Sequence, residues 1–148
     1  MLREGGVEVS GFTTEELREG RRRVGFAVES VSGDWAVMAH VDLPGPPRVG
    51  KYGIDLPGFE RVALPALTAS GRVVVIDELG KMELASEAFR HAVTAAFEGD
   101  APVVATVHRF RHPFTDALKR APGVEVLPVS ERTRGQLPEE LATRFLSS

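Results

Sequence analysis

Two adjacent acids, Asp77 and Glu78, follow the apolar run Val73–Ile76 directly and have the side-chain types and spacing that suit chemistry at a strand end. A short, continuous apolar run is typical of a strand buried on both faces of a parallel sheet. Ligands of such sheets bind at the carboxyl ends of the strands. There, one carboxylate can hold Mg²⁺ and its neighbour can orient and deprotonate a water that attacks a phosphate. The same pattern also fits an ordinary strand followed by an acidic helix start.

A glycine-rich segment at residues 45–51 (GPPRVGK) matches the first seven positions of the phosphate-binding motif GxxxxGK[ST]. Tyr52 stands where that motif needs a small hydroxyl, and residues 53–58 (GIDLPG) disfavour the helix whose N-terminus would hold phosphates. We therefore interpret the segment as a loop of another kind. Arg48 and Lys51 could still contact a phosphate from this loop as positive charges.

Two histidines, His108 and His112, follow a second buried strand predicted at residues 101–107 (APVVATV). This position is again the carboxyl end of a strand. If the phosphate belongs to a bound nucleotide, His108 could face it and contact its terminal phosphate. The alternative is a polar connecting loop. A histidine metal site is not indicated, because no third ligand follows at a suitable spacing.

The elements that position these residues alternate along the chain from residue 72 onward. Strands are predicted at residues 72–76, 101–107 and 124–129, and helices at 84–97, 113–120 and 137–146. This alternation predicts an α/β sheet with parallel strands and helices on its faces. Upstream, the sequence predicts a strand at 7–13, a hairpin of strands 23–30 and 35–41, a loop at 42–57 and a helix at 59–68 bent at Pro65.

The chain of 148 residues, with a net charge of −3 and no cysteine, fits one domain. The lack of cysteine excludes disulfides, thiolate nucleophiles and cysteine metal sites. No window approaches the roughly 18 apolar residues of a membrane span, and no apolar signal segment opens the sequence, so we expect a cytoplasmic monomer. The basic run Arg21–Arg23 is interpreted as a hairpin edge or turn, and nucleic acid is not an expected partner.

Several segments together resemble the small P-loop nucleoside triphosphatases of the cancer-related or thermophilic type. The segments are GFTTEE at residues 11–16, REG at 18–20, RVGF at 23–26, RVGKYG at 48–53, VIDELGKME at 75–83 and HPF at 112–114. They follow the family's order and span nearly the whole chain. The resemblance implies a mostly parallel α/β sheet of the P-loop type, with helices on both faces and an inserted β-hairpin.

The resemblance also implies Mg²⁺-dependent hydrolysis of ATP, GTP and other nucleoside triphosphates to the diphosphate. Carried over by position, Asp77 would hold the hydrated Mg²⁺ and Glu78 would activate the water. Thr14 and Glu15 would lie near the site at the end of a strand. RVGKYG would be a family loop, distinct from the phosphate-binding one.

One departure from the family concerns the segment ahead of GFTTEE, where the family has a strand, a GK[ST] loop and a helix. These are absent from the sequence, which removes the backbone cradle for the phosphates. We therefore expect weak or no turnover from the chain as given. Residues 1–6 (MLREGG) read like the last turn of a helix, so we hypothesise a start at an internal methionine of a longer protein. The alternatives are a non-catalytic nucleotide- or partner-binding remnant of the fold and a small-substrate kinase.

Overall fold

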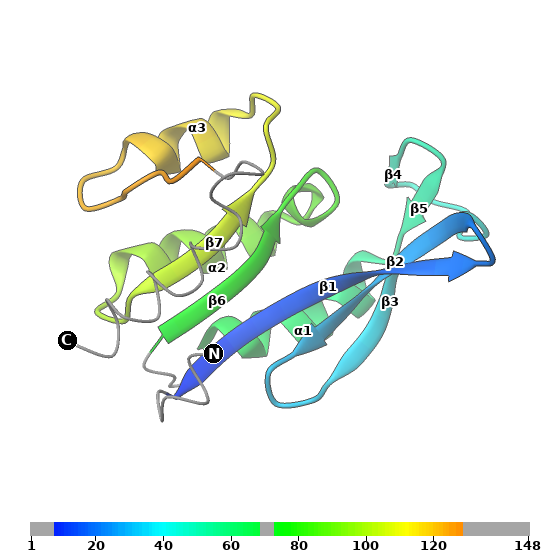
Figure 1. Ribbon diagram of the computed structural model, residues 1–148, viewed down its shortest axis with the longest axis horizontal. Helices are drawn as coiled ribbons and strands as arrows, with labels where there is room; N and C mark the ends of the chain where they lie inside the picture. Colours follow the sequence, from blue (N-terminus) through cyan, green and yellow to red (C-terminus); the bar gives the residue numbers. More distant parts are fainter. Residues whose placement is uncertain (1–7, 69–72, 129–148) are drawn as a thin grey trace.

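The computed structural model describes residues 8–68 and 73–128, which form a seven-stranded sheet in the order β4-β5-β3-β2-β1-β6-β7 (Figure 1). The strands are β1 (Val9–Glu19), β2 (Arg22–Ser30), β3 (Trp35–His40), β4 (Arg48–Val49), β5 (Tyr52–Ile54), β6 (Val73–Leu79) and β7 (Val103–Val107). The helices are α1 (Leu56–Thr68), the 3₁₀ turn η1 (Glu83–Ala85), α2 (Glu87–Glu98) and α3 (Pro113–Arg120). The predicted α/β class is confirmed.

The predicted parallel arrangement holds for β6, which carries the two acids, and for its two neighbours β1 and β7. The other neighbouring strands, from β1 outward to β4, pair antiparallel. The reason is that β1 continues to Glu19 and turns back at once through Gly20 and Arg21. A connection of two residues can join only antiparallel strands, so the polar stretch after Thr13 extends the hairpin instead of ending the strand.

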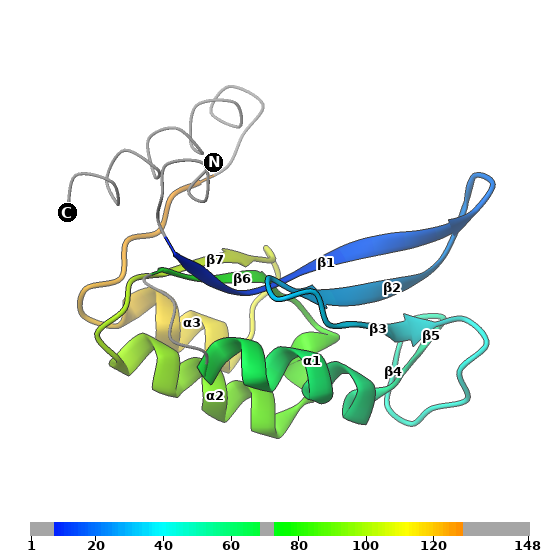
Figure 2. The ribbon, with the colours of Figure 1, turned by 90° about the horizontal axis from the view of Figure 1, so that it is seen from below.

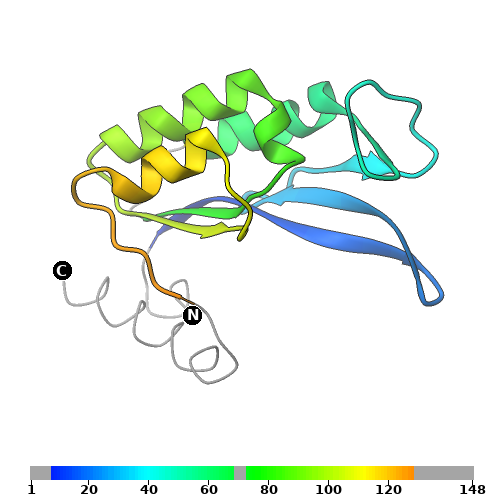
Figure 3. The ribbon, with the colours of Figure 1, turned by 90° about the horizontal axis from the view of Figure 1, so that it is seen from above.

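All three described α-helices, α1, α2 and α3, lie on one face of the sheet (Figure 2). The prediction of helices on both faces included a helix at residues 137–146, which falls outside the described residues. The suggested helix end at residues 1–6 also falls outside them. In Figure 3 the β1–β2 hairpin extends well beyond the layer of helices. Its tip therefore lacks the support of the helix layer.

Three phenylalanines pack helices α1 and α2 against the sheet. Phe12 on β1, Phe59 on α1 and Phe89 on α2 are all 0% exposed. Their rings meet edge to face, with centroid separations of 5.8, 5.7 and 5.1 Å, the geometry that aromatic quadrupoles favour. Ser86 caps α2 by accepting a hydrogen bond from the Phe89 N–H at 3.0 Å. The cap and the aromatic cluster fix the segment that follows β6.

Two sequence predictions need correction. The strand predicted at 124–129 is wrong for residues 124–128, which have no regular secondary structure; Val126 is 55% exposed and no neighbouring strand pairs with this stretch. The predicted loop at 42–57 contains the short strands β4 and β5. An isolated apolar run does not make a strand unless a partner satisfies its backbone. Within the described ranges, no helix is long and apolar enough to cross a membrane.

Candidate functional site

Asp77 and Glu78 lie at the carboxyl end of β6, between β1 and β7, as the sequence predicts. Their side chains have different surroundings. The Asp77 Oδ1 atom accepts a hydrogen bond of 2.7 Å from the Thr106 hydroxyl on β7. Glu78 instead lines a groove of about 300 Å³ that opens toward β1 and β2. The two adjacent acids therefore serve two different sides of the strand end.

Two walls make up most of this groove, and Met38 and Val49 complete its lining. The strand-end wall consists of Glu78, Gly80, Lys81, Met82 and Glu83. The hairpin wall consists of Thr14, Glu15, Glu16 and Phe26. The strand-end wall belongs to β6 and the turn into α2, and the hairpin wall belongs to β1 and β2. Thr14 thus lies at the groove together with Glu78, the proximity that the family resemblance implied.

The strand-end wall contains a buried acid, Glu83, which is only 5% exposed. Its pKa is raised to about 8, mainly by burial and also by the nearby charges of Glu78 and Asp77, while hydrogen bonds from backbone N–H groups partly oppose the rise. The pKa of Glu78 is also raised, first by burial and then by Asp77. Glu83 is therefore mostly neutral at pH 7, and Glu78, although exposed, is a stronger base than a fully solvated glutamate.

Sequence reasoning missed Glu83 because the short segment KMELA gives no clear periodicity. Its signal was a single glutamate between the apolar residues Met82 and Leu84, just ahead of a predicted apolar helix face. Leu84 is 3% exposed. A glutamate between apolar residues can indicate a buried acid, because the apolar neighbours are expected to lie in the core.

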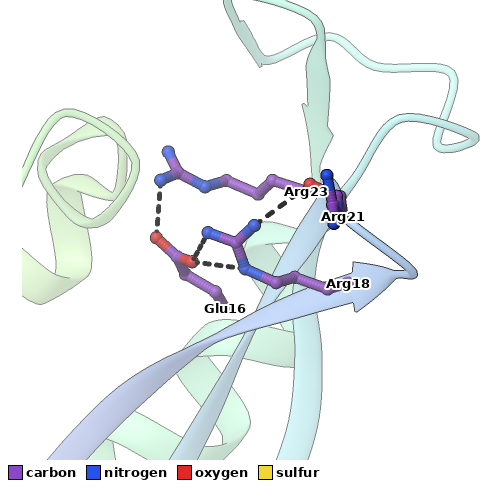
Figure 4. Close-up of polar contacts among 4 residues, drawn as sticks. All are labelled: Glu16, Arg18, Arg21 and Arg23. Atoms are coloured by element: carbon purple, nitrogen blue, oxygen red, sulfur yellow. Dashed lines mark hydrogen bonds and ion pairs between the residues drawn. The ribbon is translucent and has the colours of Figure 1, made fainter.

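Glu16 of the hairpin wall is the centre of an exposed ion cluster near the hairpin turn (Figure 4). Glu16 accepts from the Arg18 guanidinium at 2.7 Å and from the Arg23 guanidinium, also at 2.7 Å. Arg18 donates in addition to the Arg21 carbonyl at 3.2 Å. The side chains of the ion-paired residues are 38–47% exposed. The basic run of residues 21–23 forms the hairpin turn and the start of β2, as predicted.

Three of the predicted nucleotide contacts are engaged elsewhere in the structure. The Glu15 carboxylate accepts a hydrogen bond from the Trp35 indole at 3.2 Å. Arg48 donates to the carbonyls of Leu43, Pro44 and Lys51 and so holds its own loop together.

The third of these contacts, Lys51, places its Nζ 5.4 Å from the centre of the Tyr52 ring. Residues 48–54 form the β4–β5 hairpin. Helix α1 begins directly after it at Leu56, so the prediction that residues 53–58 disfavour a helix is wrong. The segment ends in a short antiparallel hairpin, which differs from the strand–loop–helix arrangement of a phosphate-binding loop and supports the interpretation of GPPRVGK as a loop of another kind. A role for Arg48 and Lys51 in binding a nucleotide stays a prediction.

His108 follows β7 and lies stacked on the Phe110 ring. Burial, followed by the nearby positive charge of Lys119, lowers its pKa, so the ring is neutral at pH 7. Neither ring nitrogen has a hydrogen-bond partner within the described part of the chain. Lys81 of the strand-end wall places its Nζ 4.8 Å from the centre of the Phe110 ring. His108 is thus near the strand-end wall, whereas the His112 Nδ1 accepts the Phe114 N–H and caps α3.

The donor atoms at Asp77 fit a divalent cation with few protein ligands. Thr106 occupies one carboxylate oxygen, and the side chain is half-buried. The described residues contain no group of three or more histidine, aspartate or glutamate side chains placed to hold a metal. Mg²⁺ is commonly held by one or two carboxylates, with waters and substrate phosphates completing the octahedron. Asp77 can provide that kind of site.

Comparison with known protein sequences points to one family. Residues 1–142 match the model of a family described as NTPase. The chain is 37% identical over 134 residues to the nucleoside-triphosphatase THEP1 of Thermotoga petrophila, which covers 88% of this chain and 75% of that protein. It is also 37% identical over 164 residues to the cancer-related nucleoside-triphosphatase of Homo sapiens, covering 100% of this chain and 86% of the relative.

Two solved structures have a similar fold. The crystal structure of THEP1 from the hyperthermophile Aquifex aeolicus matches with a TM-score of 0.86 and 29% identity, covering 97% of this chain and 87% of that one. The solution structure of a human cancer-related nucleoside triphosphatase matches with a TM-score of 0.83 and 36% identity, covering 99% and 86%. Sequence and fold therefore agree on the same group of proteins.

Proposed function

The chain belongs to the NTPase family, and we propose that it hydrolyses nucleoside triphosphates, including ATP and GTP, to the diphosphate and phosphate. Its relatives are named nucleoside-triphosphatases, and the general activity, hydrolysis of a nucleoside triphosphate, follows from that membership. Our finer proposal is that Mg²⁺ is required and that Asp77 and Glu78 have separate roles.

The separation of the two acid side chains supports this division. Asp77 is oriented by Thr106 from β7, which suits a residue that must hold an ion in one place. Glu78 borders the groove, where water can enter. Bound at Asp77, Mg²⁺ would neutralise the charge that builds on the phosphate oxygens.

In the proposed reaction, Glu78 accepts a proton as a water oxygen attacks the terminal phosphorus. The bond from that phosphorus to the bridging oxygen breaks, and the nucleoside diphosphate leaves with the bonding electron pair. The proton then passes from Glu78 to solvent. The products are the nucleoside diphosphate, inorganic phosphate and one proton. Thr14 borders the same groove, and His108, neutral and without a hydrogen-bond partner in the described structure, would contact the terminal phosphate.

Replacing Glu78 by glutamine tests this assignment most directly. Glu78→Gln keeps the side-chain size but removes the base. In the catalytically active form of the protein, phosphate release from Mg-ATP and Mg-GTP should therefore fall about 10²- to 10⁴-fold. Nucleotide affinity, measured by equilibrium binding, should stay within a few-fold. Glu87→Gln is the matched control, because that side chain is 79% exposed on α2 and its loss should leave the rate unchanged.

Three results are informative. Unchanged turnover in Glu78→Gln would remove Glu78 as the base. A protein that binds nucleotide but releases no phosphate above the level of Glu78→Gln would favour the non-catalytic remnant. Equal turnover with and without Mg²⁺, after treatment with EDTA, would contradict the metal role of Asp77.

A further inference from the structure

We propose that the buried Glu83 side chain positions the Glu78 carboxylate for its reaction with water, and that Gly80 provides the space in which the two side chains lie together. This inference rests on the proposed function, in which Glu78 is the base. Glu83 is not itself a catalytic residue here, since it acts through Glu78.

The geometry at Gly80 carries the proposal. A Cβ atom built on Gly80 would lie 3.1 Å from the Glu83 Oε1 atom and 3.3 Å from the Glu78 Oε1 atom. The two carboxyl oxygens therefore approach the same point above the glycine backbone. Oxygens this near to one point can be joined by a hydrogen bond, directly or through one bridging water. A Cβ atom at residue 80 would therefore make unusually tight contacts with both carboxyl groups.

Burial makes Glu83 rigid as well as close. Its side chain is 5% exposed, and η1 places it beside Leu84, which is 3% exposed. The Ser86 N–H donates to the Glu83 carbonyl at 3.1 Å, which ties the residue to the capped start of α2. A hydrogen bond from so fixed a group would hold the Glu78 side chain in one rotamer, whereas solvent alone would leave it free.

The charges around Glu83 favour its neutral form. Burial is the main cause, and the negative charges of Glu78 and Asp77 on β6 add to it, so the pKa of Glu83 is about 8. Lys81 borders the groove and lies above the Phe110 ring. On α2, Arg90 donates to the Leu84 carbonyl, so its guanidinium is engaged by the backbone.

The remaining charged neighbours face Glu83 across the groove. Glu16 on the hairpin wall is paired with Arg18 and Arg23, and Glu15 is bonded to Trp35. With these charges paired or bonded, a protonated Glu83 can donate its O–H to the ionised Glu78. Above pH 8 it would lose that proton and repel the Glu78 carboxylate.

The test compares Glu83→Gln with Glu83→Leu by steady-state phosphate release from pH 6 to pH 9.5. Glutamine is a neutral donor of the same size, so Glu83→Gln should keep kcat within about 3-fold of wild type at pH 7. It should also lose the fall in kcat that wild type shows above a pH of about 8. Glu83→Leu fills the space without a donor and should lower kcat about 10-fold or more with KM little changed, as expected for lost orientation.

Gly80→Ala provides a second variant that leaves both acids in place. Its Cβ would contact the two carboxyl oxygens at 3.1 and 3.3 Å, so the carboxyl groups must shift by a few tenths of an ångström. We expect kcat to fall while the midpoint of thermal unfolding changes little. Gly99→Ala is the matched control, since a Cβ there meets its nearest atom at 3.5 Å, an ordinary contact. Normal kcat in Gly80→Ala would overturn the proposal. So would full activity in Glu83→Leu, or a Glu83→Gln variant that is folded but as slow as Glu83→Leu.

A measurement without turnover separates this proposal from the proposed function. The carboxyl carbon of Glu83 is followed by ¹³C NMR as pH is raised, in wild type and in Glu78→Gln. Removing the Glu78 charge should shift the Glu83 midpoint to lower pH. An unshifted midpoint would overturn the pairing, even if Glu78→Gln abolishes hydrolysis. A shifted midpoint with unchanged hydrolysis in Glu78→Gln would instead retain the pairing and reject Glu78 as the base.

Discussion

The two walls of the groove use the same residue type in opposite ways. In the strand-end wall, Glu83 is 5% exposed and burial holds its pKa at about 8. In the hairpin wall, the Glu16 side chain is 38% exposed and forms ion pairs with Arg18 and Arg23. One glutamate is kept neutral by desolvation, and the other pairs its charge with two guanidinium groups in solvent.

The difference shows where the fold can tune chemistry. A buried carboxyl responds strongly to each neighbouring charge, because solvent does not screen the interaction. An exposed ion pair is weakened by water and salt, and typically contributes about 1 kcal/mol or less. The strand-end wall leads into the capped start of α2, whereas the hairpin that carries the other wall extends beyond the helices (Figure 3). We therefore expect function to depend on the first wall far more than on the second.

The largest expected effect is a dependence of stability on pH that comes from Glu83. Its pKa is raised from 4.5 in the unfolded chain to about 8 in the folded one, so the folded state binds one more proton between these values. The stability that Glu83 contributes is fully present below pH 4.5 and is lost as pH rises toward 8. Relative to Glu83→Gln, the free energy of unfolding of wild type should fall by about 1.4 kcal/mol per pH unit within this window.

Urea unfolding of both proteins at pH 5, 6, 7 and 8 measures this slope. The comparison with Glu83→Gln matters because the lowered pKa of His108 acts with the opposite sign. The stability of the fold increases as pH rises toward 6.5, because the neutral form of His108 is favoured in the folded state. This effect is the same in both proteins and cancels in the difference between them. Parallel curves for the two proteins would show that Glu83 is ionised at neutral pH and would remove the contrast between the walls.

How far the sequence predicts this site depends on the wall. Asp77 and Glu78 could be placed because a continuous apolar run ends at two acids, and parallel strands bring such ends to one edge. The helix at 113–120 could be predicted to the residue from Pro113 at its first turn. These signals are local in the sequence, and the structure has the predicted strand end and helix at these positions.

The rest of the site depends on contacts between distant segments. Thr106 lies in an ordinary-looking strand sequence, and only the β6–β7 pairing brings it to Asp77. The groove at Glu78 exists because β1 runs on past Thr13 into a long hairpin, although residues 14–19 are mostly polar. Arg48 illustrates the reverse case, since a promising positive charge proves to be engaged by carbonyls of its own loop.

A smaller effect is expected at the edge of the strand-end wall, where Thr106 orients Asp77. Thr106→Val keeps the side-chain shape but removes the hydroxyl that donates to the Asp77 Oδ1 at 2.7 Å. Loss of a partner that orients a metal ligand typically costs about 10-fold or more in metal affinity. The Mg²⁺ concentration that gives half-maximal phosphate release should rise by about that factor.

Thr106→Ser is the matched control, because it retains the donor and should keep the wild-type Mg²⁺ requirement. Thr94→Val serves as a second control, since the Thr94 hydroxyl donates only to the Arg90 carbonyl of its own helix. An unchanged Mg²⁺ requirement in Thr106→Val would place the ion elsewhere and would separate Asp77 from the metal.

The smallest effect is expected in the hairpin wall. Arg23→Ala removes one of the two ion pairs of Glu16 and a guanidinium that lies 5.7 Å from the centre of the Phe26 ring. The side chain is 45% exposed, so the free energy of unfolding should fall by about 1 kcal/mol or less. In about 1 M salt, where the screening length is roughly 3 Å, most of the difference should disappear.

Arg22→Ala is the matched control for this change, since Arg22 neighbours Arg23 on β2 and has no ion pair within the described residues. Urea unfolding at low and high salt gives the stability, and phosphate release gives the activity of both variants. A loss of turnover in Arg23→Ala of 10-fold or more, with Arg22→Ala normal, would contradict the contrast between the walls. A loss of that size would indicate that Arg23 releases Glu16 and binds the substrate phosphates. Loss of an exposed ion pair by itself would not slow the reaction 10-fold.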